Sequence, residues 1–378
     1  MNIYVNELVR ALVRAGVDCD IYVRRTRAEQ PSVVEVEPGM TVHHLGVGPW
    51  DLPKERLPAI LDEFTDAVEP LVPASEPDAI HAHYWLSGVV GHSLKHRLNR
   101  PLVMTFHTLS KVKELGGEPP APIRADAETA IVGCSDVVLA NTSTEAGELV
   151  DLYGADRDRV EVVSPGVDHR YFTPGSRSAA REVLGLGPVP MLLFVGRIQR
   201  LKGLDLAVET LAASEHSDAK LVVVGGPSGL EGFGALQHAE DLAHELGVAD
   251  RVRWTSPLAH HRLGAYYRAA DVCIVPSRSE SFGLVALEAA SCGLPVVAAH
   301  VGGLAEVVDH GTTGFLVHER EASHYAAFVD QIIGDSELAY GLSLKAVARA
   351  DDYSWSAAAA RLRRLYGDIT SGALVTCQ

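Results

Sequence analysis

Two glutamates in the second half of the chain have a spacing suited to binding sugar hydroxyls. Glu280 and Glu288 are eight residues apart, in a segment that follows an apolar strand and enters a predicted helix. One carboxylate then lies at the helix entrance and the other about two turns further on. They could hold a sugar and a ribose, while the amides of Ser281, Phe282 and Gly283 at the helix N-terminus could bind an anion. The alternative is that Glu280 stabilises the helix dipole and Glu288 lies on a solvated face.

Two cations follow an earlier strand of the same half. The apolar run Met191–Val195 leads into Gly196-Arg-Ile-Gln-Arg-Leu-Lys-Gly, and a helix is predicted to begin near Asp205. Arg197 can donate two hydrogen bonds from its planar guanidinium, and Lys202 adds a mobile point charge. The pair suits a diphosphate. A solvated loop with two exposed cations is the alternative.

The first half carries histidines and aromatic residues beside two further strands, in His-Ala-His-Tyr-Trp-Leu-Ser-Gly and Thr-Phe-His-Thr-Leu-Ser-Lys-Val-Lys. His81 and His83 face one side of a strand, and we expect a hydrogen-bonded pair there in preference to a metal site. Tyr84 and Trp85 could line a site or pack in the core. The basic stretch 92–100 is expected to be a solvated helix face.

The acidic and cysteine patterns predict no metal site. The two Asp-x-Asp strings, Asp18-Cys-Asp20 and Asp156-Arg-Asp158, are expected at surface turns or strand edges. The cysteines are widely scattered and contain no Cys-x-x-Cys pair, so the sequence predicts no disulfide framework and favours a reducing cytoplasm. They are Cys19, Cys134, Cys273, Cys292 and Cys377.

Short β-branched runs alternate with longer amphipathic stretches along nearly the whole chain. This alternation is typical of an α/β protein with doubly wound parallel sheets, in which ligands bind beyond the carboxyl ends of the strands. A Pro/Gly-rich connection between 164 and 176 indicates a hinge, so we predict one domain over 1–170 with about 355–378 and another over 171–354. Strands are expected at 19–23, 41–45, 78–83, 101–106, 136–141, 160–164, 191–195, 220–224, 251–255, 271–276, 294–298 and 314–317.

Composition agrees with two domains and excludes several functions. The chain has 378 residues, of which 47% are hydrophobic and 22% charged, and this length favours about two domains. Its 33 Lys and Arg against 49 Asp and Glu give a net charge of −16, which argues against binding nucleic acid and weakens any role on anionic lipid. No apolar run approaches the roughly 20 residues that span a bilayer.

These motifs, taken together and in order, resemble the family-4 retaining glycosyltransferases. The Glu280–Glu288 segment resembles the family's E-x7-E motif, and the 196–203, 267–271, 292–296 and 302–315 segments match its other motifs. The resemblance implies a GT-B fold of two facing Rossmann-like domains, with the C-terminal helix crossing back to the first.

By the same resemblance, Arg197 and Lys202 would bind the diphosphate of a nucleotide sugar, and Glu288 its ribose. Glu280 would bind the transferred sugar and His107 would lie beside it, both as catalytic residues. No cofactor or catalytic metal is implied, because cations and helix amides can take over the charge of the leaving group.

The first half resembles, more narrowly, the inositol-phosphate glycosyltransferases of actinomycete mycothiol biosynthesis. That resemblance assigns the acceptor phosphate to Lys54, Tyr84, Thr108 and Arg124, since two cations and two hydroxyls can satisfy a dianion. Asn2 would hold the acceptor ring.

The chain departs from this pattern around its acceptor loop. Glu114 stands where these enzymes usually have Asn, and the loop before Glu118–Pro122 is shorter. An aminocyclitol or a small thiol is therefore an alternative acceptor. Rival classes are a nucleotide-sugar epimerase and an inactive nucleotide-sugar-binding protein.

The resemblance also bears on the N-terminus and on partners. In the family, a strand and a Gly-Gly loop precede the helix that begins here at Asn2, so we expect the first strand to be missing from this sequence. The expected partners are the small-molecule donor and acceptor. A homodimer is a further possibility.

Overall fold

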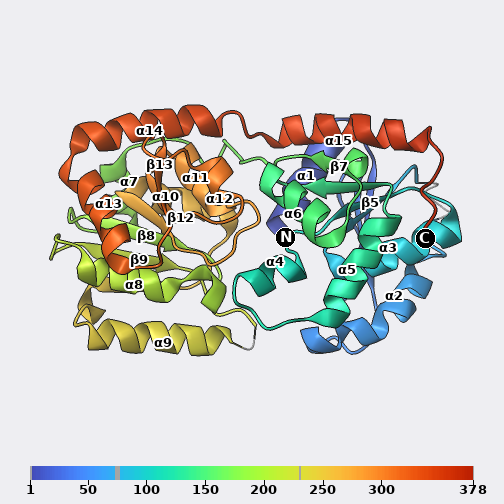
Figure 1. The fold of residues 1–378 in the computed structure, drawn as a ribbon, viewed down its shortest axis with the longest axis horizontal. Coiled ribbons are helices and arrows are strands. Elements are labelled where there is room, and N and C mark those ends of the chain that lie inside the picture. Colours follow the sequence, from blue (N-terminus) through green and yellow to red (C-terminus); the bar gives the residue numbers. More distant parts are fainter. Residues whose placement is uncertain (1, 73–76, 230, 378) are drawn as a thin grey trace. The chain divides into compact units, whose positions relative to one another are not determined.

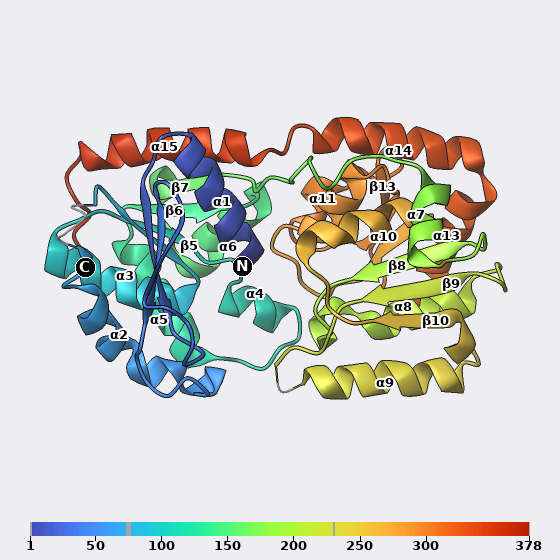
Figure 2. The same ribbon diagram turned by 180° about the vertical axis from the view of Figure 1, so that it is seen from behind.

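The computed structural model describes residues 2–72, 77–229 and 231–377, which fold as two compact units (Figure 1). The first unit contains the chain up to Gly166 and again from Trp355 onward. The second extends from Val167 to Ser354. The last helix, α15 (Trp355–Thr370), thus belongs to the first unit and packs against α1 (Asn2–Arg14) (Figure 2).

The second unit is built on a six-stranded parallel sheet of order β10-β9-β8-β11-β12-β13. Because β9 and β10 extend the sheet on one side of β8 and the later strands on the other, the strand order reverses between β8 and β11. Ligands bind beyond the carboxyl ends of the strands at such a point. The strands are β8 (Met191–Val195), β9 (Lys220–Val224), β10 (Val252–Thr255), β11 (Val272–Val275), β12 (Val296–Ala299) and β13 (Gly314–Val317).

Helices cover both faces of this sheet, which is why its strands are apolar on both sides. Leu192 and Phe194 pack toward α8, α9 and α13, whereas Met191 and Leu193 pack toward α7, α10 and α11. Helix α14 contributes to both cores. The helices are α7 (Arg177–Leu184), α8 (Leu204–Ala213), α9 (Gly232–Glu245), α10 (Leu263–Ala269), α11 (Leu284–Ser291), α12 (Leu304–Val307), α13 (Ala322–Gly334) and α14 (Ser336–Ala350).

The first unit contains two sheets. A four-stranded parallel sheet has the order β4-β5-β6-β7, with strands β4 (Ile80–His83), β5 (Leu102–Thr105), β6 (Val137–Ala140) and β7 (Val160–Val162). A three-stranded sheet has the order β1-β3-β2, with strands β1 (Cys19–Arg24), β2 (Val33–Glu37) and β3 (Met40–Leu45). Strands β1 and β4 are end strands of their sheets, and the strand expected before Asn2 stays a prediction.

Helices also cover both faces of the four-stranded sheet. Helices α3 (Trp85–Leu98), α5 (Pro122–Cys134) and α6 (Ser143–Tyr153) pack on one face, and α1 and α15 on the other. Shorter helices connect these elements: η1 (Lys54–Ile60), α2 (Leu61–Val68) and α4 (Ser110–Leu115). Trp85 is buried in the core formed with α5 and α6.

Every predicted strand has a counterpart, but the sequence analysis missed β2. This strand is antiparallel to β3 at the edge of its sheet and has a register shift between Glu35 and Glu37. Most of its side chains are exposed, so it lacks the apolar run that marked the other strands.

One cysteine prediction needs correction. The structure joins Cys134 and Cys377 in a disulfide, with Cα atoms 4.7 Å apart, although the spacing predicted no disulfide. The two residues are separated by 243 positions, and only the return of the C-terminal segment to the first unit brings them together. Cys19, Cys273 and Cys292 are free.

Candidate active site

The predicted donor residues gather at the carboxyl ends of β8 and β11. The Lys202 ammonium lies 2.6 Å from the Glu280 carboxylate, and Ser277 donates a hydrogen bond to the same oxygen at 3.2 Å. Lys202 comes from the loop after β8 and Glu280 from the loop after β11. The structure therefore joins two predicted donor residues at the point where the strand order reverses.

Glycines allow these loops to approach one another so closely. A side chain at Gly203 would collide with the carbonyl of Pro276 at the end of β11, and one at Gly302 would collide with the carbonyl of Glu280. Both glycines also have positive φ angles, +69° and +47°, which other residues adopt only at a cost. The amide of Gly303 donates to the Glu280 carbonyl at 2.9 Å, so the loop after β12 supports the acidic loop.

Glu288 is buried and its two oxygens are held by different side chains. His260 Nε2 lies 2.7 Å from Oε1, and the Tyr267 hydroxyl donates to Oε2 at 2.7 Å. Burial, and next the negative charge of Glu288, raise the pKa of Tyr267 well above its usual range, so this hydroxyl stays a donor. Glu288 is thus not on a solvated face. Sequence reasoning missed His260, which lies in no motif.

The remaining donor residues differ in what they present. Arg197 is exposed, and no ion pair links it to another described residue. Phe282 is buried and packs edge-on against Tyr353 at 5.7 Å, so only its backbone can meet a ligand. Ser281 is partly buried, and Gly283 precedes α11 with a φ of +102°.

In the first unit, the four predicted phosphate ligands come together around one aromatic ring. The Lys54 ammonium and the Arg124 guanidinium lie 5.6 and 5.2 Å from the centre of the Tyr84 ring. Arg124 also donates to the hydroxyl of Thr108 at 3.0 Å and to its carbonyl at 2.6 Å. These residues come from η1, the end of β4, the loop after β5, and α5.

A buried glutamate that the sequence analysis missed fixes Arg124. Glu128, one turn along α5, accepts a 2.7 Å hydrogen bond from Arg124 Nε. Its second oxygen accepts from the Ser110 amide at 2.8 Å and the Tyr153 hydroxyl at 2.5 Å. The spacing of four residues is a helical signal for the ion pair, but nothing in the sequence indicated that Glu128 is fully buried.

Strained backbone marks the same edge of the four-stranded sheet. Tyr84 and His107 follow β4 and β5 and have φ angles of 77° and 62°, a region that large side chains rarely adopt. Such strain is concentrated at functional sites, where the surrounding structure maintains it.

Three histidine rings lie together at this edge, and two of them are hydrogen-bonded to each other. His83 Nδ1 lies 3.1 Å from His107 Nε2, and His81 contacts the Thr105 hydroxyl at 2.9 Å. Burial, and next the neighbouring His83, lower the pKa of His107 well below its usual value, so His107 is neutral near neutral pH. His81 and His83 each have a hydrogen-bond partner, as expected, but they are not bonded to each other.

Two residues of α1 lie at the start of the described chain. Asn2 is exposed in the first turn. Tyr4, which the sequence analysis did not single out, packs edge-on against the His107 ring at 4.7 Å. Tyr4 is buried, and no motif marks its contact with a candidate catalytic residue.

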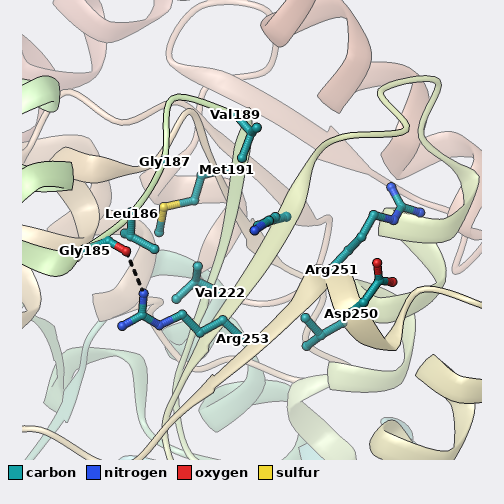
Figure 3. Close-up of a pocket in the computed structure, with 11 residues that line it drawn as sticks. Gly185, Leu186, Gly187, Val189, Met191, Val222, Asp250, Arg251 and Arg253 are labelled. Atoms are coloured by element: carbon teal, nitrogen blue, oxygen red, sulfur yellow. Dashed lines mark hydrogen bonds between the residues drawn. The ribbon is translucent and has the colours of Figure 1, made fainter.

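A cavity of about 120 Å³ in the second unit lies away from these loops (Figure 3). Its lining includes Met191, Lys220 and Val252, the first residues of β8, β9 and β10. It therefore lies at the amino ends of the strands, the opposite edge from the predicted donor site. Arg253 donates to the carbonyl of Gly185 at 3.5 Å beside it.

Two family models match the chain in succession. The model described as "Glycosyl transferase 4-like domain" matches residues 1–166, and the model described as "Glycosyl transferases group 1" matches residues 176–346. The fold and these matches thus define a GT-B glycosyltransferase.

Relatives define the family more narrowly. "D-inositol 3-phosphate glycosyltransferase 2" of Catenulispora acidiphila is 45% identical over 381 residues, which cover 97% of this chain and 89% of that protein. The D-inositol 3-phosphate glycosyltransferase of Geodermatophilus obscurus is 46% identical over 370 residues, covering 94% and 81%. The chain belongs to this family of glycosyltransferases.

Solved structures agree on the fold. Sucrose-phosphate synthase from Thermosynechococcus elongatus superposes with a TM-score of 0.92 at 33% identity, covering 97% of this chain and 93% of that one. Anabaena HepE, solved in complex with UDP and glucose, gives a TM-score of 0.74 at 22% identity over 81% and 82% of the two chains. This second likeness shows the fold alone.

Proposed function

We propose that this chain transfers a hexose or N-acetylhexosamine from a nucleoside diphosphate sugar to an inositol phosphate, with retention of configuration. One observation carries the choice of acceptor: Lys54 and Arg124 both lie beside the Tyr84 ring and Arg124 contacts the Thr108 hydroxyl, so two cations and two hydroxyl-bearing residues gather in the first unit. The names of the relatives, D-inositol 3-phosphate glycosyltransferases, support the same acceptor.

On the donor side, we propose that Lys202 exchanges its ion-pair partner, Glu280, for the diphosphate when the nucleotide sugar binds. The ammonium now pairs with Glu280. When a diphosphate binds, Lys202 and the exposed Arg197 neutralise its charge, and the Glu280 carboxylate becomes available to the hydroxyls of the transferred sugar. Glu288, held in place by Tyr267 and His260, accepts hydrogen bonds from the ribose through its remaining lone pairs.

These cations and the amides at the start of α11 stabilise the leaving diphosphate. We therefore propose that catalysis needs no divalent cation or other cofactor. His107 acts as a neutral hydrogen-bonding group beside the donor sugar, since its environment disfavours the imidazolium. Initial rates measured with and without added Mg²⁺ should agree, and a strict requirement for Mg²⁺ would contradict this part of the proposal.

A panel of acceptors tests the proposal. The protein is incubated with UDP- and GDP-sugars and with D-inositol 3-phosphate, free inositol, an aminocyclitol or a small thiol, and products are identified by mass spectrometry. We expect transfer to the phosphorylated inositol alone, with the anomeric configuration retained by NMR. Equal use of free inositol would overturn the acceptor assignment. Donor turnover without acceptor would indicate an epimerase, and donor binding without transfer an inactive binding protein.

Variants of the phosphate cluster separate acceptor from donor recognition. Arg124→Ala and Lys54→Ala should raise the acceptor KM roughly tenfold to a hundredfold, the loss expected for a charged hydrogen bond. The donor KM should stay nearly constant. Lys54 is exposed, so its variant should fold normally even if loss of Arg124 disturbs buried Glu128. Arg10→Ala is the matched control, because Arg10 pairs with Glu37 at 3.1 Å and has no predicted role in binding either substrate.

We further propose that the enzyme acts in the cytoplasm on small molecules and not on nucleic acid. Its acidic charge supports this view, and no helix in the described part of the chain is long and apolar enough to cross a bilayer. A homodimer stays a prediction that light scattering can test.

A further inference from the structure

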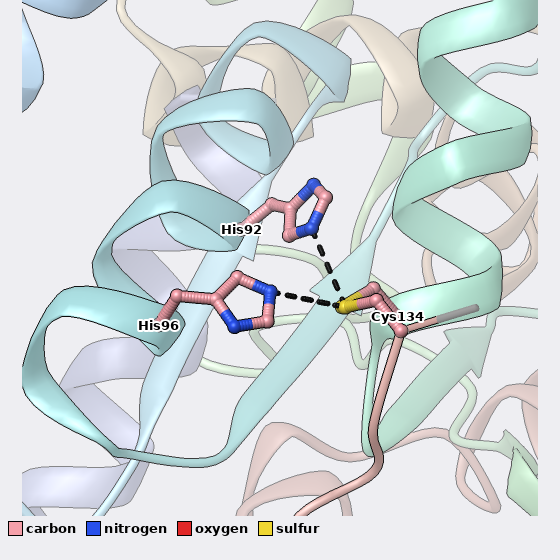
Figure 4. A group of neighbouring side chains, drawn as sticks. His92, His96 and Cys134 are labelled. Carbon is pink, nitrogen blue, oxygen red and sulfur yellow. Dashed lines mark hydrogen bonds between the residues drawn. A yellow bond between two sulfur atoms is a disulfide. The ribbon is translucent and has the colours of Figure 1, made fainter.

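Four side chains with metal-binding atoms meet in the first unit, outside the site described above. His92 and His96 lie on successive turns of α3, Cys134 ends α5, and Cys377 lies in the segment after α15. One donor atom from each lies within 4.8 Å of all the others. Figure 4 shows the imidazoles of His92 and His96 directed at the sulfur position beside Cys134, where His92 contacts the Cys377 sulfur and His96 contacts both sulfurs.

The nitrogen-to-sulfur distances within this Cys₂His₂ cluster are close to those around one tetrahedral ion. The two sulfurs are bonded to each other in the structure, and they must separate to about 3.8 Å before both can bind the ion. His96 Nε2 lies 3.0 Å from the Cys377 sulfur and 3.3 Å from that of Cys134, and His92 Nε2 lies 3.5 Å from the Cys377 sulfur. With Zn–S near 2.3 Å and Zn–N near 2.0 Å, tetrahedral zinc separates its nitrogen and sulfur ligands by about 3.5 Å. A disulfide alone needs no imidazoles, whereas zinc uses both.

Neighbouring residues form further hydrogen bonds between the segments that carry these ligands. Asp136, two residues after Cys134, accepts a 2.7 Å hydrogen bond from the amide of Val375, two residues before Cys377. Lys95, between the two histidines in sequence, donates to the Cys134 carbonyl and to Asp136, each at 2.7 Å. Lys95 is buried and so departs from the solvated helix face predicted for 92–100, whereas His96, Arg97 and Asn99 of the same stretch are exposed.

We propose that, after a thiol reductant has supplied two electrons and two protons to open the Cys134–Cys377 disulfide, the chain binds one structural Zn²⁺ at His92, His96, Cys134 and Cys377. Both imidazoles bind through Nε2 in their neutral form, and each thiol releases one proton to solvent as its thiolate binds. Two thiolates balance the charge of the ion, so the filled site is neutral. Four protein ligands leave no open position, which makes the site structural. It fastens the C-terminal segment to α3 and α5, and it does not depend on the proposed function.

Metal analysis of the full-length protein tests the site. Protein purified under reducing conditions with zinc supplied should contain about one zinc ion per chain. Replacing zinc with Co²⁺ should give the thiolate-to-cobalt charge-transfer and intense d–d bands of tetrahedral coordination. Removing the metal with a chelator should lower the Tm and expose the C-terminal segment to carboxypeptidase. No bound zinc and no cobalt spectrum would overturn the proposal.

Variants distinguish zinc from a disulfide. The double variant His92→Ala/His96→Ala should lose zinc and the cobalt bands while both cysteines remain, and Cys377→Ser should do the same without touching a packed helix. Cys19→Ser, a free cysteine of the same unit, should keep full zinc content. The opposite result would be a protein that, after reduction and reoxidation, has three reactive thiols and no metal, both in the wild type and in the double histidine variant. Cys134 and Cys377 would then form only a disulfide, and the proposal would fail.

Discussion

The buried histidines at the ends of β4 and β5 should make the first unit sensitive to acid. Burial lowers the pKa of His83 from its ordinary value of 6.5 to about 4. The folded protein then binds the proton more weakly than the unfolded chain, so lowering the pH favours unfolding. The loss of stability begins near the unfolded pKa of 6.5 and levels off below about 4.

The linkage relation gives the size of this effect. Between about pH 7.5 and about pH 5, a shift of this extent removes at most about 2 kcal/mol from the free energy of unfolding. His83→Asn removes the titrating group, so the variant should lose about that much less stability than the wild type over the same range. Any constant cost of the substitution cancels in this comparison, because only the change with pH is used.

Urea unfolding followed by tryptophan fluorescence can measure this in one unit. Of the four tryptophans, Trp254 alone lies in the second unit, so a Trp254→Phe background reports on the first. His244→Asn, an exposed histidine of α9, is the control and should leave the pH dependence unchanged. If wild type and His83→Asn lost stability equally on acidification, the assignment of a neutral buried His83 would be wrong.

Three further substitutions test the structure. Glu288→Gln should weaken donor nucleotide binding about tenfold in calorimetry, because the amide replaces one acceptor by a donor while keeping its shape. Gly302→Ala should destabilise the protein by about 1–3 kcal/mol in thermal unfolding, since the added methyl group would collide with backbone atoms. Gly311 also has a positive φ but lies in open space, so the control variant Gly311→Ala should cost about 1 kcal/mol. Equal losses of stability in the two variants would contradict the predicted collision at Gly302. Lys95→Ala should cost about 3 kcal/mol in urea unfolding by leaving buried Asp136 without its cation, and a loss below about 0.5 kcal/mol would refute that ion pair's role.

The strands and loops of the second unit could be predicted from the sequence because their signals are local. A parallel strand covered on both faces must be apolar throughout, so a short apolar run such as Met191–Val195 can be assigned to a buried strand from the sequence. The loop after each strand carries its chemistry within a few residues, as Lys202 and Glu280 do. Parallel pairing then places these loops at one edge of the sheet, and the structure joins the two side chains at 2.6 Å.

Partners from distant segments could not be predicted in this way. Glu288 is held by His260 and Tyr267, 28 and 21 residues away, and Glu128 binds the Ser110 amide across 18 residues. A single glutamate on a helix has the same appearance in sequence whether it is solvated or buried. Burial depends on which element packs over it, which is a property of the tertiary structure.

The sequence by itself therefore determined the class of fold, the family resemblance and the residue types at the two predicted ligand sites. Tertiary structure alone decided that Tyr4 packs on His107, that Lys95 is buried, and that Cys377 reaches Cys134 and two histidines of α3. The reason is physical. Secondary-structure periodicity and loop chemistry act over a few residues, whereas Cys377 returns to the first unit 243 positions after Cys134, and no local sequence pattern indicates that return.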